Sequence, residues 1–131
     1  ILETDLIEIC EAIIKEELEK INISFSDLAT VCKYAVPDGY PDNPIKGEEV
    51  DISNVKNKDL MFYASVERKK EKLIQIGSRT IAIVGHGDSI WEAEQIAEKN
   101  ILKVKGPLFH RKDIGTTELI QKKLNHMLSI K

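Results

Sequence analysis

The sequence predicts an α+β domain in which helices pack against an antiparallel sheet. Apolar residues recur at helical spacing near both ends of the chain and once between them, whereas short β-branched and apolar runs fill the middle. Connections of hairpin length join the middle runs, which favours antiparallel pairing and argues against a doubly wound sheet. With 131 residues, 42% hydrophobic and 31% charged, we expect one globular domain, or one domain with a remnant of another attached.

Charge and hydropathy argue against several classes of protein. The net charge of −3 argues against a nucleic-acid partner, which usually meets a basic surface. No apolar run reaches the length of a membrane span and no secretory signal is evident, so we expect no membrane partner and a cytoplasmic location. Cys10 and Cys32 lie within apolar patterns and are expected to be free thiols. The chain begins at Ile1 without a methionine, so we expect that residues upstream are missing or were trimmed.

The first two elements follow from periodicity. An amphipathic helix is expected over residues 5–20, with Thr4 as its N-cap, and its apolar stripe needs a partner. A strand is expected over residues 29–36, which are β-branched and apolar, and Pro37 closes it.

The loop over residues 37–47 is the segment best suited to bind a ligand. Three of the four prolines and two of the seven glycines of the chain fall within it, which forbids regular structure and stiffens the backbone. A stiff loop binds a ligand at a low entropic cost, and Tyr40 and Lys46 offer a stacking or hydroxyl contact and an anion contact. Guidance of the chain from one strand to the next explains the prolines equally well.

Three further strands and a helix are expected over residues 60–103. Strands are expected over 60–66 and 72–76, joined by a charged hairpin tip, and over 80–84, where Gly85-His86-Gly87 ends the strand. That Gly-x-Gly could also cradle a phosphate, but a plain strand-to-helix turn explains it more simply. Ser89 and Glu92 have the spacing of a capping box, which opens a helix through about Lys103.

The C-terminal part is expected to contain a short extended piece and a last helix. The extended piece covers residues 108–111, and the helix begins at about Thr117. Its inward residues are expected to be Leu119, Ile120, Leu124, Met127 and Leu128.

Residue spacing offers little catalytic chemistry. The three histidines, His86, His110 and His126, are far apart and have no zinc-ligand spacing. Ser78 and Ser89 are not in nucleophile elbows, and most acidic residues are expected on solvent faces of helices. We therefore expect neither a catalytic residue nor a metal ligand on this chain.

Five short motifs stand in a fixed order along the chain. They are Gly39-Tyr40-Pro41 with Lys46-Gly47, Tyr63-Ala64-Ser65, Gly77-Ser78-Arg79, Val84-Gly85-x-Gly87 with Glu92-Ala93, and Arg111-Lys112-Asp113-Ile114-Gly115. Together these five landmarks resemble the C-terminal domain of the phosphoribosylamine–glycine ligase family. Any one of them would be weak, but five in register over residues 28–115 are hard to obtain by chance.

The resemblance implies an ATP-dependent ligase of purine biosynthesis. The family joins 5-phosphoribosylamine to glycine, using ATP and Mg²⁺, and the carboxylate is activated as an acyl phosphate. The C-terminal domain is similar to the antiparallel lid of biotin carboxylase-type ATP-grasp enzymes, with a rudiment single hybrid motif of barrel-sandwich type. The resemblance further implies that residues 1–24 end the ATP-grasp domain and that residues 25–131 form the C-domain. The apolar stripe of the first helix should then pack less completely than that of the helix over 89–103.

The resemblance also implies a set of site residues. The Mg²⁺ and nucleotide ligands would lie upstream of this chain, so we expect no cofactor on it and no ATP turnover by it alone. Arg111 is expected to reach a phosphate, while Asp113 accepts backbone N–H groups in a structural turn with Gly115. Pro44 and Ser78 depart from the family pattern. The residues expected at the substrate or nucleotide cleft are Gly39, Tyr40, Pro41, Lys46, Gly47, Arg79 and Arg111.

An alternative stays open from the sequence. The chain could be a stand-alone binding or regulatory module, or a docking subunit, that has the same fold and no catalysis of its own. The upstream sequence, or the mass of the native protein, would discriminate between these possibilities.

Overall fold

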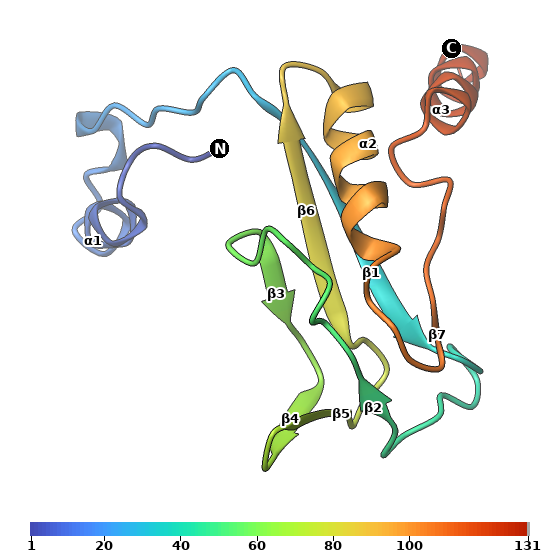
Figure 1. The fold of residues 1–131 in the computed structure, drawn as a ribbon. Helices are drawn as coiled ribbons and strands as arrows, with labels where there is room; N and C mark the ends of the chain where they lie inside the picture. Colours follow the sequence, from blue (N-terminus) through green and yellow to red (C-terminus); the bar gives the residue numbers. More distant parts are fainter. Residues whose placement is uncertain (131) are drawn as a thin grey trace.

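The computed structural model describes residues 1–130, which form two antiparallel sheets and three α-helices, one of which packs against the sheets (Figure 1). The predicted α+β class with antiparallel pairing is confirmed. In chain order the elements are α1 (Leu6–Ile14), the 3-10 helix η1 (Leu18–Lys20), β1 (Ala29–Pro37), β2 (Glu49–Val50), β3 (Met61–Tyr63), β4 (Val66–Lys69), β5 (Lys72–Gln75), β6 (Ile81–Gly87), α2 (Ile90–Ile101), β7 (Leu108–Phe109) and α3 (Thr117–Ser129).

The larger sheet has four strands in the order β3-β6-β1-β7. Its two long strands, β1 and β6, pair with Lys33 opposite Ile83. Helix α2 lies along these two strands and covers one face of the sheet (Figure 1). The main core lies between this sheet, α2 and the smaller sheet; its buried members are Ala35, Val50, Val55, Met61, Leu73, Ile81, Ile83, Ile101 and Val104.

The smaller sheet has the order β2-β5-β4, and it corrects one expectation from the sequence. The single strand expected over 60–66 is wrong, because the chain leaves β3 in one sheet and enters β4 in the other. The break falls at Ala64 and Ser65, whose N–H groups donate to the carbonyls of Thr80 and Arg79 at 3.1 and 2.8 Å. The hairpin between β4 and β5 is confirmed, whereas β2 was not expected, because two residues carry no period.

The end of β6 also differs from the expectation. The strand does not stop at Gly85 but runs through Gly87, and His86 pairs with Thr30 of β1. Gly85 serves close packing rather than a turn: a Cβ there would lie 2.0 Å from the carbonyl oxygen of Ala93 in α2. The glycine therefore lets the helix approach the strand backbone.

Helix α2 confirms the capping prediction with one change. The Ser89 hydroxyl accepts the N–H of Glu92 at 3.2 Å, while the Glu92 carboxylate accepts the N–H of Asp88 at 3.0 Å, one residue before the expected donor. Ala93, Ala97 and Ile101 are buried, whereas Ile90, in the first turn of the helix, is 45% exposed.

Helix α1 is shorter than the expected span of residues 5–20. It ends at Ile14, and Glu16 adopts φ +56°, which no helix continues. Asp5 is the N-cap, because the Thr4 hydroxyl instead accepts the N–H of Ser24 at 2.7 Å. Residues 1–4 thus pair with residues 22–26, including a bridge between Leu2 and Phe25.

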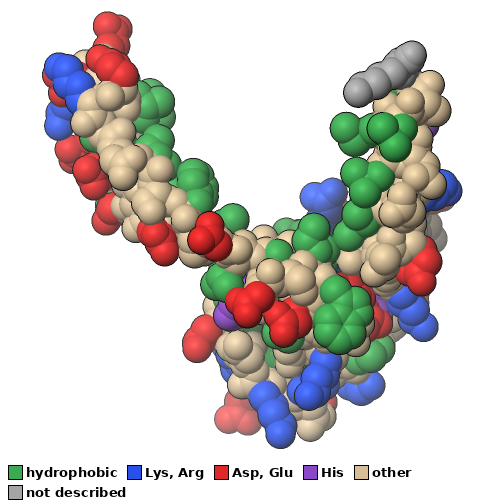
Figure 2. Space-filling model, turned by 90° about the horizontal axis from the view of Figure 1, so that it is seen from above, with side chains coloured by type: hydrophobic (Ala, Val, Ile, Leu, Met, Phe, Trp, Pro, Cys, Tyr) green, Lys and Arg blue, Asp and Glu red, His purple; other side chains and the backbone are tan. Residues whose placement is uncertain are grey.

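Both terminal helices leave apolar side chains exposed. As expected, the stripe of α1 packs less completely than that of α2: only Ala12 is buried in α1. The inward orientation expected for α3 is wrong, since none of its residues is buried and Leu124, Met127 and Leu128 are exposed. Figure 2 shows two arms, the N-terminal segment with α1 on the left and α3 on the right, with hydrophobic side chains on the sides that face the space between them.

Candidate functional site

A cavity of about 530 Å³ lies on the face of the larger sheet opposite α2. Side chains alternate along β1: Val31, Lys33 and Ala35 are buried toward the helix, whereas Cys32 and Tyr34 point to the other face and line the cavity. The complete lining is Cys32, Tyr34, Val36, Tyr40, Pro41, Arg79, Phe109, Arg111 and Ile114. One face of β1 therefore supplies core packing and the other supplies a site.

The cavity brings together four of the seven residues expected at a ligand cleft. Tyr40 and Pro41 come from the loop over 37–47, Arg79 precedes β6, and Arg111 follows β7. The guanidinium of Arg79 lies over the ring of Tyr34, 5.7 Å from its centroid, which is within cation–π range. Two cationic side chains beside tyrosine rings form a site suited to an anion that carries a flat or polar group.

The other three expected cleft residues do not line this cavity. Gly39 has φ +83°, and a Cβ there would lie 2.2 Å from the carbonyl oxygen of Asn43, so glycine is required by the fold of the loop. Gly47 donates its N–H to the carbonyl of Gln75 at 2.8 Å and ties the loop to β5. Lys46 is exposed, and its expected contact with an anion stays a prediction.

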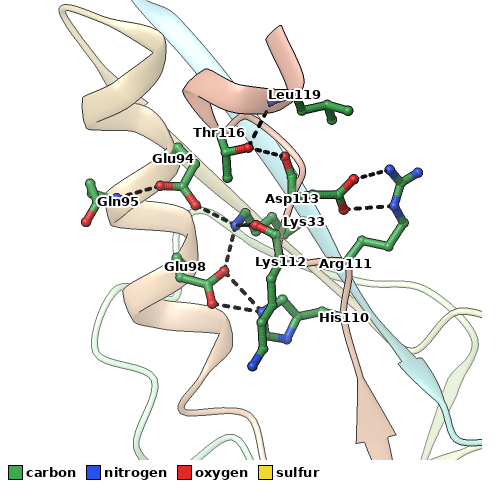
Figure 3. Close-up of polar contacts among 10 residues, drawn as sticks. All are labelled: Lys33, Glu94, Gln95, Glu98, His110, Arg111, Lys112, Asp113, Thr116 and Leu119. Atoms are coloured by element: carbon green, nitrogen blue, oxygen red, sulfur yellow. Dashed lines mark hydrogen bonds and ion pairs between the residues drawn. The ribbon is translucent and has the colours of Figure 1, made fainter. Parts of the chain in front are cut away.

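Arg111 and Asp113 form an ion pair at the rim of the cavity. Nε and Nη2 of Arg111 donate to the two carboxylate oxygens of Asp113 at 3.0 and 2.5 Å (Figure 3). The hydrogen bond from Arg111 holds the pKa of Asp113 below its usual range, although desolvation acts in the opposite direction. The Asp113 carboxylate therefore pairs with the guanidinium of Arg111, and the acceptance of backbone N–H groups expected of it stays a prediction.

Backbone and side-chain contacts of residues 113–116 hold the turn that leads into α3. The backbone carbonyl of Asp113 accepts from the N–H and the hydroxyl of Thr116, at 3.1 and 2.9 Å, and Thr116 caps the helix. Gly115 adopts φ +83°, and a Cβ there would press on the side chain of Val31. Arg111 also lines a second cavity of about 470 Å³, beside Lys122, Lys123 and His126 of α3.

Behind the cavity, a buried lysine joins three elements. Nζ of Lys33 in β1 donates to Glu94 and Glu98 of α2, at 2.6 Å each, and to the backbone carbonyl of Lys112 at 3.0 Å (Figure 3). Nε2 of His110 lies 3.0 Å from one oxygen of Glu98. We call Lys33, Glu94, Glu98 and His110 the buried charge cluster. All three N–H groups of Lys33 have a partner, which is the condition for a buried ammonium.

A family model described as "Phosphoribosylglycinamide synthetase, C domain" matches residues 30–117, which is 88 of the 131 residues. The chain belongs to this family. The resemblance inferred from the five landmarks is thereby confirmed. The match begins at the second residue of β1, so it contains the whole cavity and the buried charge cluster.

Relatives of the C-domain carry the name of a larger enzyme. The chain is 47% identical over 131 residues to a phosphoribosylamine–glycine ligase of Methanosarcina acetivorans, covering 100% of this chain and 30% of the relative. It is 45% identical over 130 residues to a protein of the same name from Methanocaldococcus jannaschii, covering 97% and 29%. A crystal structure of phosphoribosylamine–glycine ligase from Thermotoga maritima matches with a TM-score of 0.56 and 32% identity over 61% of this chain and 20% of that chain. The chain thus spans about 30% of its curated relatives.

Sequence reasoning missed the buried charge cluster of the C-domain. It placed most acidic residues on solvent faces, yet Glu94 is 5% exposed and Lys33 is 1% exposed. The sequence did contain an indication of this cluster. Lys33 lies on the same face of β1 as Val31 and Ala35, and Glu94 lies on the same face of α2 as Ala97. Two charges of opposite sign at inward positions indicate a buried pair.

Two further structural observations concern residues 1–130. No three His, Cys, Asp or Glu side chains of these residues lie close enough together to hold a metal ion. None of the helices in this part of the chain has the length and apolar composition needed to cross a membrane.

The cluster predicts a loss of stability in acid. Burial by itself would raise the pKa of Glu98, but hydrogen bonds from Lys33 and His110, and their charges, bring it below its ordinary value of 4.5. A carboxyl whose pKa is depressed in the folded state stabilises the fold above its unfolded pKa, and this contribution is lost as the pH falls through the folded pKa. Urea denaturation between about pH 3 and 6 should therefore show a steeper fall in the free energy of unfolding for wild type than for Glu98→Gln.

The matched control for this experiment is Glu67→Gln. Glu67 is exposed and, among residues 1–130, forms its ion pair with exposed Lys69, at 3.3 Å, so its replacement should leave the wild-type pH dependence almost unchanged. If the free energy of unfolding fell equally steeply with decreasing pH in wild type and in Glu98→Gln, the assignment of this titration to Glu98 would be contradicted.

Proposed function

We propose that this chain is the C-terminal part of a phosphoribosylamine–glycine ligase, an ATP-dependent enzyme that joins 5-phosphoribosylamine and glycine to form glycinamide ribonucleotide in purine biosynthesis. The observation that carries the proposal is the C-domain match over residues 30–117, together with relatives of that name at 47% and 45% identity across nearly the whole chain. In this proposal the C-domain closes over an active site that other parts of the enzyme complete. The enzyme would act in the cytoplasm.

The proposed domain boundary lies near residue 25. Residues 1–24 would end an ATP-grasp domain, and residues 25–131 would form a C-domain of the biotin carboxylase-type lid. Two observations support this boundary. The apolar stripe of α1 is exposed, and the family match starts at residue 30. The exposed apolar sides of both arms would be covered by the rest of the enzyme.

The cavity would contribute positive charge to the active site. Arg79 and Arg111 fit the phosphate of 5-phosphoribosylamine or of ATP, because a guanidinium presents paired N–H groups that match phosphate oxygens. The ion pair with Asp113 orients the guanidinium of Arg111. The described residues do not fit Mg²⁺, since no three acidic or imidazole side chains of residues 1–130 are placed so that they could hold a metal ion. We therefore propose that the binding sites for Mg²⁺ and the nucleotide lie in domains upstream of this chain.

Arg111→Ala tests the proposal in the complete enzyme. Loss of a charged hydrogen bond to phosphate should raise the apparent KM for 5-phosphoribosylamine or for ATP by about 10- to 100-fold. The measurement is glycine- and 5-phosphoribosylamine-dependent release of ADP under steady-state conditions. An enzyme that releases no ADP in the presence of both substrates would contradict the proposed reaction.

Lys46→Met serves as the comparison. Lys46 comes from the loop that supplies Tyr40 but does not line the cavity, so its replacement should raise the same KM less than Arg111→Ala does. A larger effect of Lys46→Met would move the anion site from the cavity to the outer side of the loop.

A further inference from the structure

We propose that His110, Glu98 and Lys33 are positioning residues that hold Arg111 at the cavity. The inference rests on the proposed function, in which Arg111 binds the anionic group of a substrate. It assigns to the buried charge cluster a role in substrate binding in addition to its role in stability.

The first argument is the way in which the cluster brackets Arg111. The residue before Arg111 is tied to α2, because Nε2 of His110 lies 3.0 and 3.1 Å from the two oxygens of Glu98. The residue after it is tied to β1, because the carbonyl of Lys112 accepts from Nζ of Lys33 at 3.0 Å. Between these two anchors, Arg111 points away from α2 and toward Asp113 (Figure 3).

The second argument is that the β-ladder does not reach Arg111. Strand β7 is two residues long, and its pairing with β1 ends at Val36 opposite Phe109. The next backbone hydrogen bond along the segment is the one from Thr116 to Asp113. The backbone that carries Arg111 is therefore positioned by the contact of the His110 side chain with Glu98 and by the hydrogen bond from the Lys33 side chain to the carbonyl of Lys112.

The third argument is that the two sites share one strand. Lys33 is buried on the α2 face of β1, and its neighbours Cys32 and Tyr34 line the cavity on the other face. The lysine that anchors Lys112 thus lies on the strand that forms the floor of the cavity. A hydrogen bond from a buried ammonium whose three N–H groups all have acceptors fixes backbone position better than one from an exposed lysine, because few alternative arrangements satisfy all its partners.

The central test is His110→Leu in the complete enzyme. It removes the contact to Glu98 but leaves Arg111 and the cavity lining unchanged. We expect the KM that Arg111→Ala raises to increase by about tenfold, because a displacement of about 1 Å of a binding group weakens its contact strongly, while kcat stays within about twofold of wild type. His110→Gln keeps an N–H donor for Glu98 and should retain a KM close to wild type.

Ile101→Ala is the matched control for stability. Ile101 is buried on α2, as part of the main core, and it belongs neither to the cluster nor to the cavity. Its replacement should lower the melting temperature without changing the KM. An equal rise in KM in Ile101→Ala and His110→Leu would overturn the positioning role, because destabilisation alone would then explain it.

A double variant separates positioning from independent binding. If His110 acts through Arg111, the KM of His110→Leu with Arg111→Ala should equal that of Arg111→Ala alone. Effects that multiply would overturn the proposal. An Arg111→Ala enzyme with the wild-type KM would overturn the anion role of Arg111 and the positioning role with it. A raised KM in Arg111→Ala beside an unchanged KM in His110→Leu would overturn the positioning role alone.

Discussion

Lys33→Met is expected to lower the free energy of unfolding of the chain by about 3–5 kcal/mol, since it leaves buried carboxylates without their cation. Lys33 is 1% exposed, and its ammonium is the shared partner of Glu94 and Glu98 at 2.6 Å. Methionine keeps most of the length of the side chain, so the effect comes from charge rather than from a cavity. Urea denaturation near neutral pH measures the difference.

The pKa of Lys33 fits this expectation. Burial would lower it, but the hydrogen bonds and charges of Glu94 and Glu98 outweigh burial and raise it above its ordinary value of 10.5. A lysine with a raised pKa stabilises the fold below its unfolded pKa, and this contribution is lost as the pH rises through the folded pKa. Lys33 is therefore fully charged and fully stabilising at neutral pH.

Lys72→Met is the control for Lys33→Met. Lys72 forms an ion pair of the same length with Glu49, 2.6 Å, but both side chains are more than half exposed. Its replacement should change stability by no more than about 1 kcal/mol. Similar losses in the two variants would contradict the assignment of a large stabilising role to the buried cluster.

Gly85→Ala is expected to destabilise the chain by about 3 kcal/mol, at the upper end of overpacking effects. The added Cβ would lie 2.0 Å from the carbonyl oxygen of Ala93 and 2.7 Å from the N–H nitrogen of Ala97. Both are backbone atoms of α2, so no side-chain rotation relieves the overlap and the helix must move off the sheet. Thermal and urea denaturation measure the loss.

Gly47→Ala separates this steric effect from a conformational one. Gly47 adopts φ +85°, but a Cβ there would meet no atom within 4 Å. Its replacement should cost about 1 kcal/mol, the usual penalty of a left-handed alanine. A Gly85→Ala variant as stable as Gly47→Ala would mean that α2 tolerates a small shift from β6.

The sequence by itself determined the family and most element types. Strand β1, helix α2 and the β4–β5 hairpin follow from local periodicity and capping, because these features depend on neighbouring residues alone. The landmark residues were enough to identify the C-domain. They also included five of the residues that line the cavity, Tyr40, Pro41, Arg79, Arg111 and Ile114.

Only the tertiary structure decided which faces are buried and which side chains meet. The outward orientation of α3 and the split between β3 and β4 depend on which surfaces are available for packing, and periodicity gives a stripe without its partner. Lys33 and Glu94 pair although they lie 61 residues apart in the sequence. The position of Arg111 at the cavity depends on residues 110–112, which are anchored to α2 through Glu98 and to β1 through Lys33. Such contacts form because strand β1, helix α2 and the residues after β7 converge in space, and no local pattern encodes that convergence.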